Sequence, residues 1–396
     1  MADMVKNNTK VAIKEEVTEG TYVAPAAGSD FISPLSDGLE FSPSKELLER
    51  SNLNSSIGHS TPRTGMKSVT GTLPVEAKAN GTEGAAPEYG LLVEAALGSK
   101  RAVTTSSAND TDSGTPHTVS RIYLLDTDAS KYAVGDVAHI KVSGGHHVSP
   151  ITAVSNTAGD VYIDLLVAAG SIFTDGDAIS AVQMYVTGNS AHPSFSVTKY
   201  MEDARREYAA GCRVNSMSVN NFTTGQLADF GFGFEGLSWD SDISAIGLTP
   251  SFDAALPPVV LSACFYEDGV QLAVNEVNVT IENTLGFKTS TCSANGKIGS
   301  RITDRKVSFT FNPYKQDNEV ANFARFRDNT EFSAFFYMAV PTVTGEYKDI
   351  VAVYMPNCLI TEYSEADADG LLQEAMTATA GRGADGTEEE IYIAFI

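Results

Sequence analysis

The strongest structural signal in the sequence is the run Leu227-Ala228-Asp229-Phe230-Gly231-Phe232-Gly233-Phe234-Glu235-Gly236-Leu237. Its phenylalanines occur at every second position and alternate with glycine. Because successive side chains of a β-strand point to opposite faces, the three rings share one face. The same letters match G-x-G-x-x-G, but a dinucleotide-binding loop requires a helix to begin there. The alternation therefore predicts a strand with one buried face.

The overall composition favours a β-protein with an acidic surface. The chain has 396 residues, 42% of them apolar, which is enough for two or three domains with cores of their own. Short alternating segments bounded by glycine outnumber amphipathic helical stretches. The 27 basic and 50 acidic residues give a formal charge of −23. Such a surface repels nucleic acid and anionic membranes.

The four cysteines indicate free thiols rather than a disulfide framework. They are Cys212, Cys264, Cys292 and Cys358, and no C-x-x-C pair occurs. In a chain of this length, such spacing is typical of buried thiols in a reducing compartment. Residues 1–17 contain no apolar core of a signal peptide, and no apolar run reaches the length of a membrane span. We therefore expect neither export nor membrane insertion.

Two further segments give clear local predictions. The segment Lys67–Glu76 alternates, with Val69, Gly71, Leu73 and Val75 on one face, and predicts a strand. The segment Pro87–Gly98 predicts a short helix, because proline suits a first helical turn and glycine suits a C-cap.

The second half of the chain repeats the order of the first. Each half has a Ser/Asn-rich run ending in Ile-Gly, a V-[ST]-x-T-[LF] strand, a short helix, a Cys-containing strand and a final alternating strand. These segments lie at 51–58, 69–73, 87–97, 212–214 and 227 onward, and again at 290–299, 307–311, 319–326, 358–360 and 371 onward. Chance similarity among β-rich segments is the alternative, but order and spacing agree together. The repeat predicts two tandem β-sandwich domains, each with a short flanking helix.

Residues 119–188 have no counterpart in the second half. Their short apolar runs, separated by Gly/Asp turns, are typical of a small β-barrel. We expect this barrel to be inserted between the helix and the third core strand of the first copy, on the outside of the protein. The predicted division is a terminal arm at 1–38, which packs on a neighbour or is disordered, a first domain at 39–118 and 189–245 around the inserted barrel at 119–188, and a second domain at 246–396.

Two further patterns resemble metal sites, and neither meets the requirements of one. The run 365–370 begins like a calcium-binding loop, but its twelfth position is Met376 where a glutamate is required, so we predict an acidic hairpin turn. His139, His146 and His147 have no Cys or carboxylate at ligand spacing. We find no P-loop and no nucleophile motif. The sequence therefore predicts no enzyme, no cofactor and no metal site.

A charged cluster lies between two predicted strands. It consists of Asp203, Arg205, Arg206 and Glu207. A solvated turn explains it simply, and the alternative is a set of ion pairs between subunits.

Five segments together resemble a known family. They are Glu19-Gly20-Thr21-Tyr22, Gly65-Met66-Lys67-Ser68-Val69-Thr70-Gly71-Thr72-Leu73-Pro74-Val75-Glu76, Pro87-Glu88-Tyr89-Gly90-Leu91-Leu92, Gly211-Cys212-Arg213-Val214 and Gly225–Leu237. This ordered set resembles the major tail tube proteins of long-tailed bacteriophages. The resemblance covers most of residues 15–240 and, through the repeat, most of 260–396.

The resemblance implies a structural virion protein of the phage tail. Members of that family are β-sandwiches flanked by a helix, whose inner sheets join into rings that stack as the tube for DNA ejection. The implied partners are further copies of the chain, the tape measure and tail terminator proteins, and double-stranded DNA in passage, with assembly in the bacterial cytoplasm. Most members form hexameric rings, whereas members with two fused domains use three copies with pseudo-sixfold symmetry, and the repeat favours the second arrangement.

An acidic bore would let DNA slide without sticking, because like charges form no contacts. The residues from Thr361 to Ile396 hold nine carboxylates and one cation. Glu365, Asp367 and Asp369 are accordingly the candidate bore or ring-contact residues. The alternative function is an adhesive or carbohydrate-binding surface protein, for which the single tryptophan is a poor match.

Overall fold

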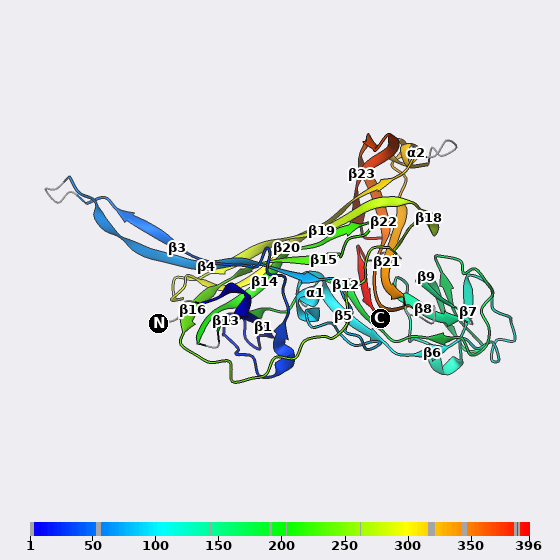
Figure 1. Cartoon of the computed structure of the whole chain (residues 1–396), viewed down its shortest axis with the longest axis horizontal. Coiled ribbons are helices and arrows are strands. Elements are labelled where there is room, and N and C mark those ends of the chain that lie inside the picture. The colour runs from blue at the N-terminus through cyan, green and yellow to red at the C-terminus, as the bar shows by residue number, and fades with distance from the viewer. Residues whose placement is uncertain are drawn as a thin grey trace.

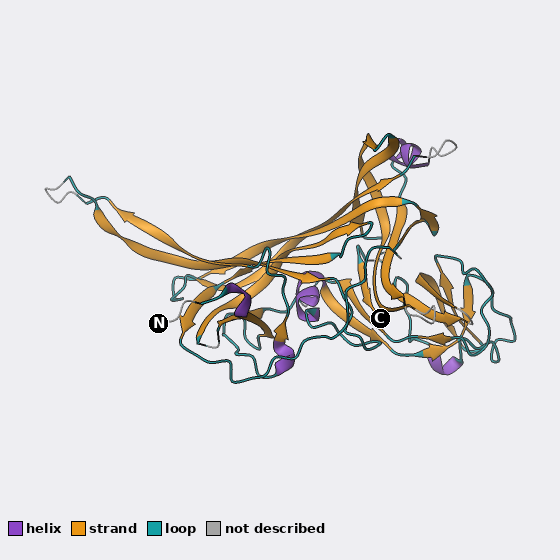
Figure 2. Ribbon diagram, viewed as in Figure 1, coloured by secondary structure: helices purple, strands orange, loops and turns teal. Residues whose placement is uncertain are grey.

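The protein is an elongated, mainly β structure (Figures 1 and 2). The computed structural model describes residues 4–52, 57–142, 145–189, 192–202, 204–261, 263–315, 321–341, 347–383, 386 and 389–396. None of the described helices is long and apolar enough to cross a membrane.

The strands and helices have the following bounds. The strands are β1 Thr9–Glu15, β2 Phe31–Ile32, β3 Glu40–Arg50, β4 Ser60–Glu76, β5 Gly98–Val103, β6 Ser106–Ser107, β7 Arg121–Tyr123, β8 Val137–Val142, β9 Gly145–Thr157, β10 Asp160–Leu165, β11 Ala178–Ile179, β12 Val182–Thr187, β13 Phe195–Met201, β14 Arg205–Thr223, β15 Asp229–Gly236, β16 Ser238–Asp242, β17 Cys264–Glu267, β18 Val270–Leu272, β19 Val274–Thr289, β20 Lys297–Pro313, β21 Phe332–Pro341, β22 Tyr347–Ala368, β23 Leu371–Gly381 and β24 Tyr392–Phe395. The α-helices are α1 Gly90–Leu97 and α2 Ala321–Asp328, and short 3₁₀ turns lie at Lys6–Asn8, Gly28–Asp30 and Asp126–Asp128.

The first half of the chain forms two sheets that share one long strand. The inner sheet has the order β3-β4-β15-β14, and the outer sheet has the order β16-β14-β13-β1-β2. Strand β14 passes from the outer to the inner sheet between Ala210 and Arg213. Gly211 lies at this crossing with φ +67°, a conformation that glycine adopts without steric cost. Helix α1 packs against β14, and its Leu92, Val93 and Leu97 are fully buried. We call this assembly unit 1.

The second half, unit 2, repeats the arrangement strand for strand. Its inner sheet is β19-β20-β23-β22 and its outer sheet is β24-β22-β21-β17-β18, and β22 is again shared by both. Helix α2 packs against β22 as α1 does against β14. The predicted duplication with mainly β units and one short helix each is therefore confirmed at the level of strand order.

The irregularities of the two units coincide as well. In unit 1, Phe195 pairs with Cys212 and the register then shifts, and in unit 2 Phe332 pairs with Cys358 before the same shift. A second shift follows on the inner side, between Val214 and Ser216 in β14 and between Ile360 and Glu362 in β22. Since bulges redirect a strand at one position, their agreement assigns each residue of β14 to the residue 146 positions later in β22.

The two inner sheets are joined into one. Strand β14 of unit 1 pairs with β19 of unit 2, with Met217 opposite Ile281 and Val219 opposite Val279. The result is a continuous sheet of eight strands in the order β3-β4-β15-β14-β19-β20-β23-β22. In the described structure, its two outer edges, β3 and the C-terminal part of β22, have no strand partner on their outer side. In Figure 1 the β3–β4 hairpin projects away from the rest of the chain.

A separate module of six short strands, in the order β6-β11-β8-β9-β10-β7, lies between β5 and β12. It begins at β6, earlier than the predicted start at residue 119. Strand β12, at the end of the predicted insert, pairs with β5 and β24 of the large sheet. The module has its own core around Ile122, Ile140 and Ile163, and this core is continuous with one face of the outer sheet of unit 2. In Figure 1 the module lies beside β21 and the C-terminus.

The strands and helices predicted from local sequence have the correct type, but their bounds differ from the predicted ones. The alternating run around Phe232 is a strand, and its three phenylalanines are buried together. The helices begin at Gly90 and Ala321, a few residues after the predicted starts, and residues 319–320 lie outside the described residues. The segment 1–38, predicted as an arm, contributes β1 and β2 to the outer sheet of its own chain. Strand β1 pairs along its whole length with β13 because its Val11, Ala12 and Ile13 are apolar and buried.

Candidate assembly surface

The first open edge is strand β3. All its side chains from Ser42 to Arg50 are exposed, and they include Leu47 (55%) and Leu48 (49%). An exposed edge strand with apolar side chains is a template for pairing with another chain. Pro43 lies within this strand, and proline is found mainly in edge strands because it has no N–H to donate to a neighbouring strand.

The second open edge is the C-terminal part of β22, which helix α2 partly covers. The Tyr363 ring lies 5.5 Å from the Phe323 ring and 6.0 Å from the Phe326 ring of α2, measured between centroids. The Tyr363 hydroxyl donates a hydrogen bond to Glu374 (2.8 Å). Phe323 and Phe326 remain 50% and 36% exposed. This edge therefore presents an aromatic cluster that is only half covered.

The two faces of the eight-stranded sheet differ in chemistry. One face is the apolar core, with Val69, Phe232, Met217, Ile281, Phe309 and Met376 almost fully buried. The opposite face alternates with it along every strand and is rich in hydroxyl and amide groups. It carries Thr70, Thr72, Ser216, Ser218, Asn220, Asn278, Thr280, Ser308, Thr310, Thr377, Thr379 and Ser364.

The sequence-predicted acidic residues follow the edge of β22 to its turn. Glu365 forms an ion pair with Lys315 and lies on the face that carries Tyr363 and α2. Asp367 accepts a hydrogen bond from the Gly370 N–H (3.0 Å). Asp369 and Gly370 have φ of +53° and +86° and connect Ala368 to Leu371 as a two-residue hairpin loop. The predicted acidic hairpin turn is confirmed, and the role of these three carboxylates in a bore or ring contact stays a prediction.

The charged cluster of residues 203–207 is paired within its own chain. Arg206 binds Asp242 through two parallel contacts, and its guanidinium lies 5.4 Å from the Tyr22 ring. The Arg206 hydrogen bonds hold the pKa of Asp242 below its usual value. Arg205 forms a 3.2 Å ion pair with Glu207. Asp203 lies outside the described residues. Arg205, Arg206 and Glu207 are the first residues of strand β14, where they pair with β13, so the prediction that they belong to a turn is wrong. A role between subunits stays a prediction.

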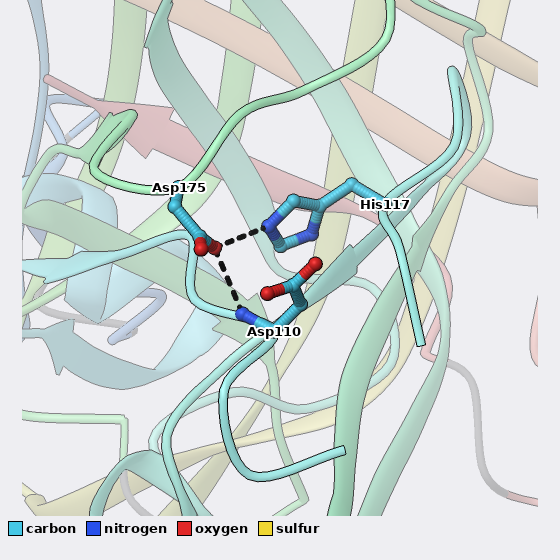
Figure 3. Close-up of side chains that lie close together, drawn as sticks. All are labelled: Asp110, His117 and Asp175. Carbon is cyan, nitrogen blue, oxygen red and sulfur yellow. Dashed lines mark hydrogen bonds and ion pairs between the residues drawn. The ribbon is translucent and has the colours of Figure 1, made fainter. Parts of the chain in front are cut away.

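Asp110, His117 and Asp175 meet in the inserted module (Figure 3). His117 Nδ1 accepts a hydrogen bond from the Tyr123 N–H (3.1 Å), so the proton of the neutral ring is on Nε2, which faces Asp175 Oδ1 at 3.1 Å. The Asp110 N–H also donates to Asp175 (2.9 Å), and these contacts lower the pKa of Asp175. Because both ring nitrogens are used, the ring offers no lone pair to a cation. The cluster is best explained as a clamp between two loops.

The histidines singled out in the sequence lie in the same module. The His139 and His146 rings are 5.9 Å apart, and His147 Nε2 donates to the Val167 carbonyl (2.9 Å). Burial, together with the nearby His146, Lys141 and His147, lowers the pKa of His139 to about 3. His139 Nδ1 contacts the Ser180 hydroxyl at 3.0 Å.

We expect His139 to make the module sensitive to acid. A histidine that is neutral when folded but titrates normally when unfolded stabilises the protein fully above pH 6.5, and this contribution is lost as pH falls toward 3. The His139→Gln variant should therefore lose less stability than the parent between pH 6.5 and 4, with a difference of up to roughly 3 kcal/mol. Urea unfolding of both proteins across this range measures the difference.

The variant must be compared with the parent because Asp136 changes the stability in the opposite direction as the pH falls. Burial raises the pKa of Asp136 to about 6, so that its protonation in the folded state adds stability as pH falls. Parallel pH profiles of parent and His139→Gln would contradict the assignment to His139.

The assembly edges are what the sequence reasoning missed. The exposure of Leu47 and Leu48 could not be read from their residue types, because apolar residues in a strand are normally assigned to a core. The available signal was the charged residue Lys45 in the same strand, because lysine is typical of exposed edge strands.

An all-β chain whose main sheet ends in two open edges, with a partly covered aromatic cluster at one of them, has the features of a subunit of a larger β-structured assembly. The family described as phage tail tube protein matches residues 6–385 of the chain. The chain therefore belongs to the phage tail tube protein family, which confirms the resemblance found in the sequence. No curated protein matches the chain.

Proposed function

We propose that the chain assembles with further copies of itself into stacked rings that form the tail tube and conduct DNA out of the capsid. The observation that carries this proposal is the continuous eight-stranded sheet with an open strand at each end. Exposed edges are an aggregation hazard in a monomer, and closing the sheet on itself through neighbouring copies removes them.

The tandem arrangement favours a ring of three copies. Each chain contains two units of equivalent strand order, so three chains supply six units around a pseudo-sixfold axis. Three eight-stranded sheets would close into a barrel of twenty-four strands without a free edge. A ring of six copies is the alternative, and it would give a barrel of twice as many strands.

The hydroxyl-rich face of the eight-stranded sheet is the proposed wall of the bore. It carries the carboxylates Glu40, Glu76, Asp229, Glu235, Glu282 and Glu362. Of the nearby cations, Lys306 lies opposite Glu282 and Lys297 forms an ion pair with Glu235. A wall of hydroxyl groups and negative charge offers phosphates no counterion release, so DNA slides without binding. This assignment places the acidic bore on the face opposite Glu365. The carboxylates of the β22–β23 turn are then proposed as ring contacts.

The remaining parts follow from that arrangement. The proposed division is unit 1, unit 2 and the inserted module between α1 and β13, with the module on the outside of the tube because the bore must stay open. We propose no catalytic activity, no cofactor and no metal, with tape measure and terminator proteins as partners, assembly in the bacterial cytoplasm and a final place in the virion tail.

Electron microscopy of the purified protein tests the proposal. The expected result is hollow rings or tubes, with class averages that show threefold symmetry and six similar densities around the bore. A species that stays monomeric at every concentration and salt condition would reject the proposal. Six inserted modules around each ring would favour the hexamer over the trimer.

A further inference from the structure

We infer that the joint between two copies repeats the joint within one chain, so that β22 of one copy pairs with β3 of the next in the register that β14 keeps with β19. The inference rests on the proposed ring, and it commits to a second copy of this chain as the occupant of both open edges. The internal β14–β19 joint serves as the template because the strands on its two sides are the counterparts of β22 and β3.

The correspondence between strands is fixed by pairing. Cys212 and Cys358 occupy the same place opposite Phe195 and Phe332, which aligns β14 with β22. For β3 and β19 we use the repeated strand motifs 69–73 and 307–311, in which Gly71 corresponds to Phe309. Phe41 pairs with Gly71 and Val279 pairs with Phe309. Phe41 is therefore the counterpart of Val279.

This correspondence gives a specific register. Within the chain, Ser216 lies opposite Glu282, Met217 opposite Ile281, Ser218 opposite Thr280 and Val219 opposite Val279. Transferred to the joint between copies, the pairs are Glu362 with Ser44, Tyr363 with Pro43, Ser364 with Ser42 and Glu365 with Phe41. Each pair joins one residue of β22 to one residue of β3 in the next copy.

Burial supports the transfer. Met217, Val219, Val279 and Ile281 of the internal joint are at most 1% exposed. Their counterparts Tyr363, Glu365, Phe41 and Pro43 are half-buried or exposed in the single chain. The edges thus lack the cover that their counterparts receive from a neighbouring unit, and a second copy in this register supplies it.

Side chains at the internal joint also bind the end of a helix. Asn283 Nδ2 donates to the Ala96 carbonyl (3.0 Å) and the Val214 carbonyl (3.3 Å), and Arg305 donates to the Leu97 carbonyl (3.3 Å). Ala96 and Leu97 are the last residues of α1, whose carbonyls have no partner within the helix. The joint therefore caps α1 with two donors from the facing hairpin.

The corresponding positions in the β3–β4 hairpin are Lys45 and Lys67. They lie directly opposite each other, as Asn283 lies opposite Arg305. Two like charges in a cross-strand pair destabilise a hairpin unless a partner binds them. Lys67 contacts the Trp239 ring at 5.3 Å, while Lys45 is exposed. At the internal joint, the C-terminus of α1 lies against Asn283 and Arg305. By the same geometry, a helix C-terminus should lie against Lys45 and Lys67.

At the joint between copies, that helix end is the C-terminus of α2 in the copy that contributes β22. Helices α1 and α2 both end in a left-handed residue, Gly98 with φ +99° and Asn329 with φ +52°, which aligns Leu97 with Asp328. The C-terminus of a helix carries partial negative charge on its last carbonyls, and Asp328 lies there, paired with Arg327 at 2.7 Å. Lys45 and Lys67 are donors and cations, so they suit this site.

Engineered cysteines test the register. In a Cys264→Ser/Cys292→Ser background, we expect Ser42→Cys/Ser364→Cys and Ser44→Cys/Glu362→Cys to form disulfides between copies upon oxidation, because directly opposite residues bring their Cβ atoms within reach. The slipped pairs Ser42→Cys/Glu362→Cys and Ser44→Cys/Ser364→Cys are the matched controls and should cross-link at least about tenfold less. Covalent ladders on denaturing gels measure the yield.

The outcomes separate the two proposals. Tubes with cross-links in the matched pairs support the register, and a ladder that stops at three chains supports the trimeric ring. Tubes that cross-link only in the slipped pairs, or in neither set, overturn the register while the tube function stands. Absence of rings and tubes in the Cys264→Ser/Cys292→Ser background rejects the tube function and the joint together.

A charge swap tests the helix cap independently. Lys45→Glu/Lys67→Glu keeps a like-charged pair within the hairpin but repels the end of α2, so the concentration required for assembly should rise at least about tenfold. Lys45→Asn/Lys67→Arg copies the internal joint and should assemble at the parent concentration. Circular dichroism and light scattering monitor folding and assembly. Folded Lys45→Glu/Lys67→Glu protein that assembles like the parent would overturn the cap.

Discussion

Deletion of residues 104–181 is expected to make the protein aggregate, although the deleted segment contains none of the repeated strands. Val103 and Val182 lie directly opposite each other at the ends of β5 and β12. An Asn-Gly turn can therefore replace the inserted module without disturbing this pair. A loss of solubility would therefore come from the surface that the module covers, and not from a distorted connection between β5 and β12.

The module covers the outer sheet of unit 2. Phe335, Tyr337, Tyr354 and Tyr392 belong to the same core cluster as Val137 and Ile140 of the module, and they are 0%, 7%, 2% and 4% exposed. Exposing four aromatic side chains costs roughly 2 kcal/mol each. Such a loss is comparable with the whole stability of a domain, which is about 5–15 kcal/mol. The module therefore acts as part of the unit 2 core, in addition to holding the outer position proposed for it.

Solubility, binding of a hydrophobic dye and urea unfolding measure the effect. Phe335→Thr should rescue the deletion variant in part, because the matching position in unit 1 is Thr198. A deletion variant with the solubility and unfolding midpoint of the parent would show that the module is dispensable for the fold. The control is Gly170→Ala, an exposed position in the module where an added Cβ meets no atom within 4 Å, so the module core stays in place.

The sequence revealed the duplication because both units keep the same chemistry at a few spaced positions. Alternating strands, a short helix and one cysteine per unit were sufficient to align them, and the structure places Cys212 and Cys358 in identical pairing environments. The long bent strands could not be predicted, since one strand that serves two sheets gives no single alternation. The burial of β21 on both faces had a visible signal in the continuous apolar run from Phe335 to Val340, which is typical of a strand covered on two sides.

The candidate assembly surface was less accessible to sequence reasoning. The acidic turn at Asp369 and Gly370 follows from local turn chemistry, so it was predicted correctly. The open edges depend on which strand lies next to β3 and β22, and that is a long-range property of the fold. The number of carboxylates in the sequence also does not predict the ion pair between Glu365 and Lys315, which lies on the face of the sheet that carries α2.

The exchange Gly71→Phe is expected to unfold unit 1, and Phe234→Ala is expected to restore part of the loss. Phe234 lies opposite Gly71 in unit 1, whereas Ala378 lies opposite Phe309 at the matching place in unit 2. In unit 1 the large residue is on β15 and the small one on β4, whereas in unit 2 the large residue is on β20 and the small one on β23. A Cβ on Gly71 would lie 2.6 Å from Cε1 of the Phe234 ring, so the two large residues cannot coexist.

A double-mutant cycle measures whether the two substitutions compensate each other in the free energy of unfolding. Gly71→Phe should cost more than about 4 kcal/mol, and Phe234→Ala alone about 3–5 kcal/mol. The double variant should be more stable than the sum of the two losses predicts, by about 1–3 kcal/mol, because each change removes the conflict that the other creates. Rescue is incomplete because the Glu40 carbonyl also lies too close to the new side chain. Gly231→Ala, whose Cβ meets only the movable Ser218 hydroxyl and the Asn220 amide on the polar face, is the control with a small effect in urea unfolding. Strict additivity of the two losses would mean that the units resemble each other in strand order but not in core packing.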